Sequence, residues 1–461
     1  MESSTAATAE PTIFVSIASY RDSQCQYTIR DLFTKAARPR RVVVGVCFQV
    51  AADDEDNFVL DLSEWSGQIR TYFLHHHEAK GPCYARALIQ QELFRGEDYY
   101  FQIDSHLRFV EAWDTLCLEQ LKLCDSPRPV LTTYASSYSL PKDYVPGEPD
   151  RAALATTSSV SILCAADFGD QTQDDPFLRI KTRICRTDIG SAPPPSLLWT
   201  ARFAFSAGDV VREVPYDPKL EYIFFGEEIA MTARLWTSGW DLFNPTRVLA
   251  YHLGSRAHRP WFREVQTSAQ HVRREADAKL RVCGLLGHEW PGGCRHAEPE
   301  APYGLGTARP LAEYEEFAGL SFRERRISEH AKCGGLPRQC FAPQWAEDER
   351  ERLMHVSQMQ DPASWAGRGN ADALHRQFPG VAVKASAAAE ESTPAEAAPT
   401  APRGQNFEAE RLRGMTQLRV DALRAQLAAG TAAAATELEL SRAFIALGQV
   451  EAADGNGRGA G

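Results

Sequence analysis

Between residues 12 and 135 the chain alternates between two kinds of segment, and this alternation limits the fold more than any other feature. Five runs are apolar and rich in β-branched residues: Thr12–Ser19, Arg41–Gln49, Ile69–His75, Tyr99–Ile103 and Val130–Ala135. Segments with helical periodicity lie between several of them, at Gln26–Ala37, Pro82–Phe94 and Ala112–Cys124. Strands and helices that alternate at this spacing form βαβ units with a largely parallel sheet covered on both faces. The sequence therefore predicts an α/β fold whose ligands gather at the carboxyl ends of the strands.

The later part of the chain is less regular. Pro141–Pro195 mixes Pro, Asp and Thr with short apolar stretches, and we interpret it as a variable loop region or a substrate lid. Order resumes with Leu198–Ala207. Further segments follow: a helix at Glu227–Thr237, an apolar run at Arg247–His252, and helices at His271–Leu286, Leu311–Ala318 and Ala346–Met359.

Composition divides the chain into five parts. Residues 1–10 are small and polar and are expected to be a disordered tail. Residues 11–345 form the main domain and 346–382 a helical extension. Residues 383–405 are rich in Ala, Glu, Thr and Pro, which is typical of a flexible linker. Residues 406–461 are expected to form a small helical tail.

That tail contains a helical pair at Phe407–Ala429 and Ala432–Leu447. The segment Leu418–Leu427 weakly resembles the first helix of a SAP-type nucleic-acid-binding hairpin, but the usual Gly-Lys continuation is missing. An amphipathic interaction helix is therefore the preferred interpretation.

Charge and composition argue against several classes of protein. The 50 basic and 61 acidic residues give a net charge of −11, which disfavours binding to a nucleic-acid backbone. No apolar run approaches the roughly 20 residues of a membrane helix, and Met1–Glu10 lacks the features of a signal peptide. The 11 cysteines show no CxxC pair, so we expect free, mostly buried thiols and a cytoplasmic protein.

The strand Tyr99–Ile103 leads into the strongest local motif. Asp104 and His106 are alternate residues of an extended segment, so their side chains point the same way and can hold one divalent cation. Asp and His are also common at turns. Both interpretations stay open on this motif alone.

A second group of polar residues lies further along the chain. Glu227 and Glu228 open a helix, where one carboxylate complements the helix dipole and the other can face a cleft and bind a polyol. His252 ends an apolar run and can supply a third metal ligand, although a lone histidine is more often structural. Asp241 is a weaker candidate for the same cleft.

Four motifs, taken together, resemble one family. They are Ser16–Asp22, Gly81–Arg86, Gln102–His106 and Trp199–Phe203. The resemblance is to the cytosolic polypeptide N-acetylglucosaminyltransferases, which add GlcNAc in α linkage to a hydroxyproline of the adaptor subunit of SCF ubiquitin ligases. It runs from Pro11 to Leu320 and includes Tyr303–Thr307. Asp104–His106 and Gly226–Arg256 are also similar to the mucin-type GalNAc-transferases, a related retaining group.

The resemblance implies a GT-A nucleotide-sugar transferase fold for residues 11–345, UDP-GlcNAc as donor and Mn²⁺ or Mg²⁺ as cofactor. By resemblance, the metal ligands are Asp104, His106 and His252. The cation would neutralise the diphosphate in an acidic protein and stabilise the departing UDP.

The donor contacts are also implied by the resemblance. Ser19, Arg21 and Asp22 would meet the uridine and ribose, and Arg86 a phosphate or the uracil edge. Arg21 and Asp22 can instead form a simple surface ion pair.

The same resemblance implies retention of anomeric configuration. Asp104, Glu227 and Glu228 are then the catalytic candidates, with the two glutamates binding and orienting the sugar and a nucleophile role less favoured. Trp199, Phe203 and Phe205 can form an apolar wall for the sugar acetamide or a prolyl ring, or they can belong to the core.

The expected function is thus a soluble, metal-dependent transferase of GlcNAc to a protein hydroxyl group, with a UDP-sugar and a protein acceptor as partners. The alternatives are another UDP-sugar or Ser/Thr acceptors, a catalytically silent UDP-sugar-binding module, or an adaptor that acts through its C-terminal helices.

Three further groups carry less weight. Consecutive strand residues point to opposite faces, so His75, His76 and His77 are interpreted as surface histidines. The zinc-type residues Cys283, His288, Cys294 and His296 have no spacing of a closed site. The basic cluster Arg323, Arg325 and Arg326 can contact an acidic acceptor, but a solvated helix face is preferred.

Overall fold

The computed structural model describes residues 10–341 except 53, 147–148, 157, 170–175, 256–257 and 288–298. The expected helical extension 346–382, the linker and the helical tail lie outside the described residues, as do residues 1–9 of the expected N-terminal tail. Within these described ranges, no helix has both the length and the apolar character needed to cross a bilayer.

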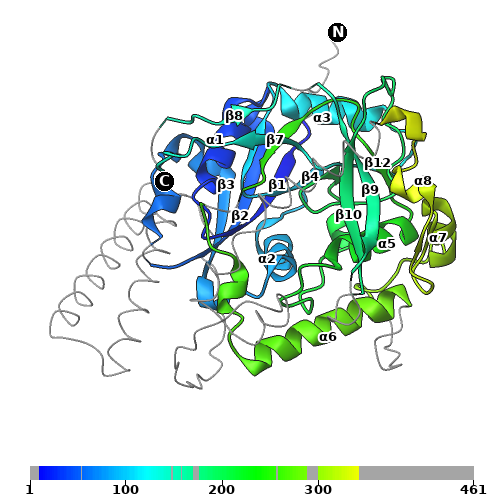
Figure 1. Cartoon of the computed structure of the whole chain (residues 1–461). Helices are drawn as coiled ribbons and strands as arrows, with labels where there is room; N and C mark the ends of the chain where they lie inside the picture. Colours follow the sequence, from blue (N-terminus) through cyan, green and yellow to red (C-terminus); the bar gives the residue numbers. More distant parts are fainter. Residues whose placement is uncertain are drawn as a thin grey trace, which may run out of the picture.

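A seven-stranded sheet forms the centre of the molecule, with the order β12-β6-β11-β4-β1-β2-β3. Its strands are β1 (Ile13–Tyr20), β2 (Val42–Val50), β3 (Ile69–His75), β4 (Tyr99–Asp104), β6 (Pro129–Thr132), β11 (Phe203–Ala207) and β12 (Asp241–Phe243). The strands β4, β1, β2 and β3 are mutually parallel, and β11 runs antiparallel to both β4 and β6. The predicted parallel sheet is therefore confirmed, and Figure 1 shows its strands β1 to β4. The strand β11, in the middle of the sheet, is reversed.

Both faces of this sheet are covered, and β1 shows why. Its residues Ile13, Val15 and Ile17 pack into the core beneath the helices α1 (Cys25–Thr34) and α3 (Trp113–Lys122). Phe14 points to the other face and packs into the core beneath α2 (Pro82–Leu88) and the π-helical turn η5 (Ile89–Leu93). Alternate strand residues thus enter different cores, which explains the continuous apolar run in the sequence.

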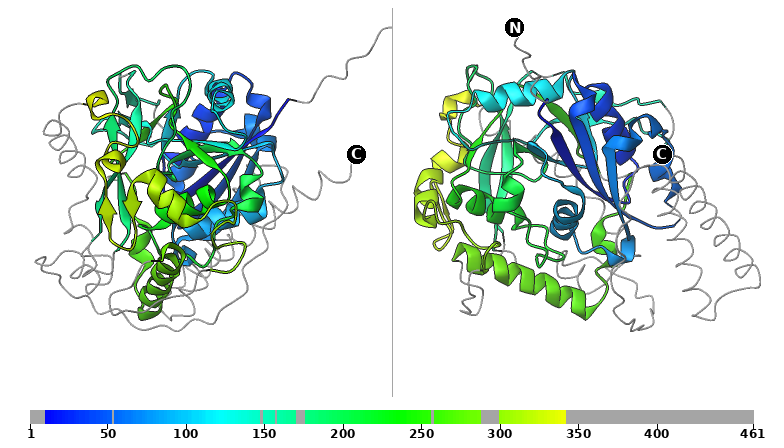
Figure 2. Two further views of the ribbon diagram at one scale, coloured as in Figure 1. Left: turned by 90° about the vertical axis from the view of Figure 1, so that its right-hand side faces the viewer. Right: turned by 180° about the vertical axis from the view of Figure 1, so that it is seen from behind.

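Further helices and turns surround the sheet. The remaining helices are α4 (Val210–Glu213), α5 (Glu227–Thr237), α6 (Ala269–Leu286), α7 (Leu311–Ala318) and α8 (Glu329–Lys332), and the 3₁₀ turns are η1 (Pro39–Arg41), η2 (Glu55–Phe58), η3 (Ser63–Gln68), η4 (His76–Glu78), η7 (Phe262–Val265) and η8 (Arg338–Cys340). The views in Figure 2 place α7 and α8 on the side of the molecule away from β3.

A second, four-stranded sheet lies against the first. Its order is β5-β13-β7-β8, with β5 at Leu107–Phe109, β13 at Ala250–Leu253, β7 at Ser136–Ser139 and β8 at Ala153–Leu154. Because β5 follows β4 after only two residues, the end of β4 lies at the junction of the two sheets. This junction is where the strongest sequence motif falls.

The structure corrects the prediction that Pro141–Pro195 is a variable loop region. This region contains the antiparallel pair β9 (Ser161–Phe168) and β10 (Leu178–Ile184). Residues of β9 are buried in two cores, whereas most of β10 is half-exposed and alternates with basic side chains. A second antiparallel pair, β14 (Leu320–Ser321) with β15 (Arg326–Ile327), follows α7.

The cysteines behave as the sequence predicts. Every described cysteine is free, and all except Cys340 are buried. They fill space in the core as small apolar side chains.

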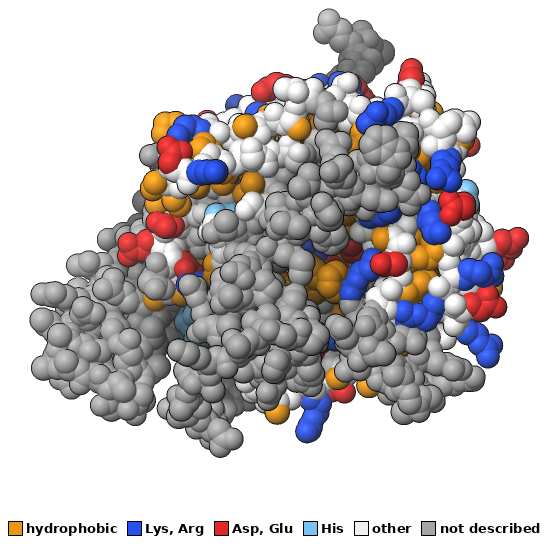
Figure 3. Space-filling model, in the orientation of Figure 1, with side chains coloured by type: hydrophobic (Ala, Val, Ile, Leu, Met, Phe, Trp, Pro, Cys, Tyr) orange, Lys and Arg blue, Asp and Glu red, His pale blue; other side chains and the backbone are white. Residues whose placement is uncertain are grey.

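The basic cluster near residue 325 is not a patch of one charge. Arg326 pairs with Glu324 at 3.0 Å, and Arg325 turns inward to donate to the carbonyl of Pro176 at 3.2 Å. Figure 3 shows Lys and Arg side chains interspersed with Asp and Glu on the side of the molecule where α7 and α8 lie. This mixture agrees with a solvated surface, but the expected helix is wrong: Arg323 and Arg325 lie in the turn between β14 and β15, and Arg326 begins β15.

Candidate active site

Three side chains from two distant parts of the sequence meet at the junction of the two sheets. Asp104 ends β4, His106 follows it, and His252 lies on β13, where it pairs with Leu107 of β5. One ligand atom from each lies within 4.8 Å of the others. Oδ2 of Asp104 is 3.1 Å from Nε2 of His252, and the two imidazole rings are 4.6 Å apart. The structure therefore brings together the three residues named as metal ligands.

A buried carboxylate fixes the orientation of His106. Nδ1 of His106 donates to Oδ2 of Asp22 at 2.8 Å, and the Ser105 hydroxyl donates to the same oxygen at 2.6 Å. Nε2 of His106 keeps its lone pair and faces Nη2 of Arg259 at 3.5 Å. Burial, together with the charge of Arg259, lowers the pKa of His106 to about 3. The imidazole is therefore neutral, which is the form that binds metal ions.

Asp22 has more partners than the sequence suggests. Its side chain is fully buried, and it accepts hydrogen bonds from the Gln24 amide at 3.0 Å and from Nε2 of His258 at 2.9 Å. Nε of Arg259 lies 3.2 Å from it. Burial alone would raise the pKa of this carboxyl, but the electrostatic interactions with His258 and Arg259 and the hydrogen bond from His106 hold it well below its usual value. The expected hydroxyl contact to ribose is not available to Asp22 in this arrangement.

Arg86 links the strand side of the site to α5. Its Nη2 donates to Oδ1 of Asp104 at 3.2 Å, and its Nη1 donates to Oε1 of Glu227. The Tyr216 hydroxyl donates to the same Glu227 oxygen at 2.8 Å. Burial raises the pKa of Asp104 in isolation, yet the hydrogen bond from His252 and the nearby positive charges lower it far more. Asp104 is therefore an anion in the folded chain.

Glu228 accepts hydrogen bonds from a separate set of donors. Its Oε2 accepts from the Tyr134 hydroxyl at 3.0 Å, and its Oε1 accepts from the Thr200 hydroxyl and from the Ala201 amide at 3.2 Å. Burial raises the pKa of Glu228, and the charge of Arg202 opposes this shift. Gly226, which precedes α5, has φ 104°, and a Cβ there would lie 2.8 Å from the Phe177 ring. This glycine thus allows the turn that places both glutamates.

The residues expected on the uridine side form an ion-pair network. Arg21 pairs with Asp54 at 2.8 Å and with Glu264 at 2.9 Å, and Ser19 is buried near the end of β1. The alternative of a simple ion pair therefore describes Arg21 in this structure, but its partners are Asp54 and Glu264. Asp22 does not take part in it.

The apolar-wall prediction is wrong for three aromatic residues. Phe203 and Phe205 are 0% exposed, and Phe203 packs edge-on against Phe101 at 4.7 Å. Trp199 is 3% exposed and lies in the core around α5. The segment before Phe203 is buried, so the aromatic residues fill the interior and present no surface to a ligand.

Asp241 also lies away from the site. It begins β12 and aligns with Pro129 of β6. Across the sheet, this position is level with the first residue of β4, whereas Asp104 is the last residue of β4. Its carboxylate pairs with Arg309 at 2.7 Å and accepts from the Ser126 hydroxyl at 2.6 Å. Asp241 is thus a structural ion-pair partner.

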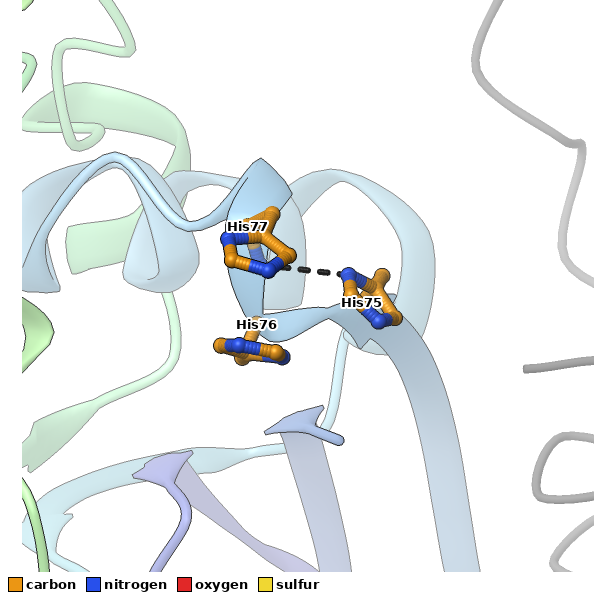
Figure 4. A group of neighbouring side chains, drawn as sticks. All are labelled: His75, His76 and His77. Carbon is orange, nitrogen blue, oxygen red and sulfur yellow. Dashed lines mark hydrogen bonds between the residues drawn. The ribbon is translucent and has the colours of Figure 1, made fainter. Parts of the chain in front are cut away.

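The geometric argument against the histidine run is wrong as well. β3 ends at His75, and the 3₁₀ turn η4 brings the rings of His75, His76 and His77 together (Figure 4). The ring centroids of His76 and His77 are 3.9 Å apart. Burial lowers the pKa of His76 to about 3. The four zinc-type residues cannot be compared in the same way, because His288, Cys294 and His296 lie outside the described residues.

Six contributors to the site were not identified individually from the sequence: Tyr134, Thr200, Arg202, Tyr216, His258 and Arg259. The guanidinium of Arg202 lies over the Tyr134 ring at 4.2 Å and acts electrostatically on Asp104 and Glu228. Thr200 and Arg202 belong to a motif that was recognised as a whole. His258 and Arg259 carry no local signal, since only the tertiary fold brings them to Asp22.

Comparison with known proteins assigns the chain to a family. The family model described as Glycosyltransferase (GlcNAc) matches residues 12–66 and 61–324. These matches span more than half of the 461 residues, so the chain belongs to the Glycosyltransferase (GlcNAc) family. The predicted enzyme class is confirmed at this level. A search of curated proteins returns no match.

Solved structures with some similarity are distant. The crystal structure of GalNAc-T7 with UDP, GalNAc and Mn²⁺ aligns with 60% of this chain at 14% identity and a TM-score of 0.43, and the alignment spans about half, 48%, of that chain. Residues 1–349 of S. aureus TarS with UDP-GlcNAc align with 59% of this chain and 70% of that chain, at 11% identity and a TM-score of 0.34. Similarity at this level assigns no ligand to the present chain.

Proposed function

We propose that this chain transfers GlcNAc from UDP-GlcNAc to a protein hydroxyl group, with retention of configuration and with a divalent cation as cofactor. Hydroxyproline in an SCF adaptor subunit is the proposed acceptor, and the cytoplasm is the proposed location. The observation that carries the proposal is the convergence of Asp104, His106 and His252 at the end of β4, within a chain of the Glycosyltransferase (GlcNAc) family.

The donor set fits a divalent transition-metal ion. Asp104 and His252 place an oxygen and a nitrogen 3.1 Å apart, about the separation of two ligands that each lie roughly 2.0 to 2.2 Å from one ion. Two imidazoles with one carboxylate suit Mn²⁺ better than Mg²⁺, which prefers oxygen ligands. When bound, the cation would neutralise the diphosphate of UDP and stabilise it as the leaving group.

The chain's own cations support the same step. Arg86 is held by two carboxylates, and the charge of Arg202 is felt by Asp104 and Glu228. Both guanidinium groups are proposed to bind a phosphate of the donor, since a guanidinium binds phosphate through two parallel hydrogen bonds. Asp22 fixes the orientation of His106 by accepting a hydrogen bond from Nδ1 of its imidazole.

The two glutamates are proposed to bind and orient the sugar. Both carboxylates already accept hydrogen bonds from protein donors, which fix their positions. A nucleophile would need one of these oxygens to leave its donors and attack the anomeric carbon. The orienting role is therefore favoured for Glu227 and Glu228. Ser19 and Arg21 are proposed to lie beside the nucleoside at the end of β1.

The proposal for the acceptor has a narrower basis. It rests on the motif resemblance between Pro11 and Leu320, because the family match specifies GlcNAc but no acceptor residue. Acceptor and donor therefore need separate experiments.

The first experiment tests the donor. UDP release is measured with UDP-GlcNAc, UDP-GalNAc and UDP-glucose, with and without Mn²⁺, for the full chain and for Asp104→Ala. We expect turnover of UDP-GlcNAc only with the cation and none above background in the variant. Preferred turnover of another UDP-sugar would refute the proposed donor. UDP binding without turnover of any donor would indicate a catalytically silent binding module.

The second experiment tests the acceptor. Matched peptides that contain hydroxyproline, proline, serine or threonine are incubated with the chain and labelled UDP-GlcNAc. Label on the hydroxyproline peptide alone supports the proposal. Label on serine or threonine peptides would contradict it while leaving the transferase activity intact.

A further inference from the structure

The run His75–His77 adopts a geometry that an extended strand cannot give. β3 ends at His75, and the turn η4 is closed at both ends by side chains: the His75 amide donates to Oε2 of Glu78 at 3.0 Å, and the His77 amide donates to Nδ1 of His75 at 3.3 Å. The Ala79 amide completes the turn by donating to the His76 carbonyl at 3.1 Å. Three consecutive imidazoles therefore lie close together around the turn, as Figure 4 shows.

The spacing of the rings suits one metal ion. The centroid distances are 4.5 Å for His75 and His76, 5.0 Å for His75 and His77, and 3.9 Å for His76 and His77. One ring nitrogen of each lies within 4.8 Å of the others. Nitrogen ligands of a tetrahedral ion at about 2.0 to 2.1 Å are roughly 3.3 Å apart. Rotation of the exposed His77 ring and the half-buried His75 ring can close this difference.

One atom of the cluster is left without a hydrogen bond. Nδ1 of His76 is buried and has no hydrogen-bond partner among the described residues. A buried polar atom without a partner costs free energy, so its presence calls for a ligand. A metal ion that coordinates this nitrogen would remove the cost.

The charges around the cluster are compatible with a cation. Glu264 acts electrostatically on His77, and Glu78 follows directly in the chain. Arg21 is the nearby positive group, but its charge is paired with Asp54 and Glu264 at 2.8 and 2.9 Å. Together, the three carboxylates of Glu78, Glu264 and Asp54 and the guanidinium of Arg21 carry a net negative charge.

We propose that His75, His76 and His77 form a second metal site, for a transition-metal ion of borderline softness such as Zn²⁺ or Ni²⁺. Three imidazoles without a carboxylate favour these ions over Mg²⁺, Ca²⁺ or Mn²⁺. The site is chemically distinct from Asp104, His106 and His252, and it does not depend on the proposed transferase reaction.

The position of this site connects it to the rest of the molecule. Turn η4 contacts η7, and the chain leaves η4 through Lys80 into α2, which carries Arg86. A bound ion would hold the connection between β3 and α2 in one conformation. Binding of the ion is therefore expected to make this segment more ordered. The experiment measures the binding itself.

The test uses the full chain purified without a histidine tag and Ni²⁺ as the probe. Isothermal calorimetry is performed on Asp104→Ala, in which the first site is removed, and on the same chain with His75→Ala, His76→Ala and His77→Ala added. We expect one equivalent of Ni²⁺ to bind the first protein and none to bind the second. Equal uptake by the two proteins would overturn the proposal.

A single substitution guards against a change in fold. His77 is exposed, so His77→Ala in the Asp104→Ala background is expected to stay folded and to weaken Ni²⁺ binding by more than about tenfold, since losing even an outer-shell partner costs that much. His330→Ala, which removes an exposed histidine of α8, is the matched control and should leave binding unchanged. Equal affinities for these two variants would contradict the three-ligand site.

Discussion

Oδ2 of the buried Asp22 lies 2.8 Å from Nδ1 of His106, and 84 positions of sequence separate the two residues. The hydrogen bond turns Nε2 of His106 toward the site shared with Asp104 and His252. A carboxylate behind a metal-binding imidazole fixes the ring and makes it a better ligand. Asp22 is therefore a positioning residue for the proposed cation.

Replacement of Asp22 tests this relationship. Asp22→Asn is expected to weaken Mn²⁺ binding by about 10- to 100-fold, because the amide no longer stabilises the imidazole as a carboxylate does. Calorimetry with Mn²⁺ measures the change. Asp143→Asn, at an exposed position that pairs with Arg151, is the control. Equal Mn²⁺ affinity of the two variants would show that Asp22 does not support His106.

Replacement of Glu228 separates orientation from nucleophilic attack. Glu228→Gln keeps the shape of the side chain, and its amide oxygen can still accept from Thr200. We expect a folded protein whose kcat falls by about 10²- to 10³-fold, as for loss of one preorganised group, with unchanged Mn²⁺ affinity. Steady-state kinetics measure this, and Glu329→Gln on the exposed surface is the control. A covalent glycosyl adduct on wild-type Glu228, detected by mass spectrometry, would contradict the orienting role.

Replacement of Phe203 tests its position in the core. Phe203→Ala removes a side chain that is 0% exposed and packs against Phe101, so the free energy of unfolding should fall by about 3 to 5 kcal/mol. Denaturant unfolding measures the loss. Phe317→Ala, at a position 39% exposed, should change stability far less. A large rise in KM for the donor without loss of stability would restore the apolar-wall interpretation.

The buried thiols should resist alkylation in the folded chain. Burial raises the pKa of Cys47 to about 12, so at pH 8 its thiolate fraction is about a thousandfold below that of an ordinary cysteine. Mass spectrometry after iodoacetamide treatment should find Cys47 unmodified until a denaturant is added. The partly exposed Cys340 should react first among the described cysteines. Rapid modification of Cys47 in the native chain would show that its surroundings open readily.

Truncation tests the role of the C-terminal part. The family match ends at residue 324, so a chain that ends at Val383 is expected to keep nearly full transferase activity. The rate of UDP release from UDP-GlcNAc, with the full chain as reference, measures this. Loss of activity in a chain that remains folded would favour a function located in the C-terminal helices.

Sequence patterns predicted the elements whose packing is periodic. The helices Glu227–Thr237 and Leu311–Ala318 were predicted with the bounds observed, and the first four strands were predicted to within a residue or two. These segments bury a regular face, so the period of their apolar residues reports their structure. The strand β10 was missed because Leu178–Ile184 alternates with basic residues and pairs with β9 across a connection that no local pattern reveals.

The candidate site was also predicted only in part from local sequence patterns. Asp104 and His106 follow a strand and attract attention by spacing alone, whereas the proximity of His252 was expected only with the help of a resemblance. The predictions for the aromatic residues and for the histidine run were wrong for physical reasons. Phe203 and Phe205 have the chemistry of a ligand wall, but the reversed strand β11 places them in the middle of the sheet. His75–His77 was judged as a strand, although the strand ends at its first residue.

The junction of the two sheets carries one more consequence. Asp104 belongs to the large sheet, while His252 belongs to the small one, whose strands have only two to four residues and few backbone hydrogen bonds to hold them. An ion shared by these residues would fasten the weaker sheet to the stronger. Amide hydrogen exchange along β13 would then slow sharply on saturation with Mn²⁺, while exchange in β2 would stay as it was, because only the small sheet would depend on the ion for its rigidity.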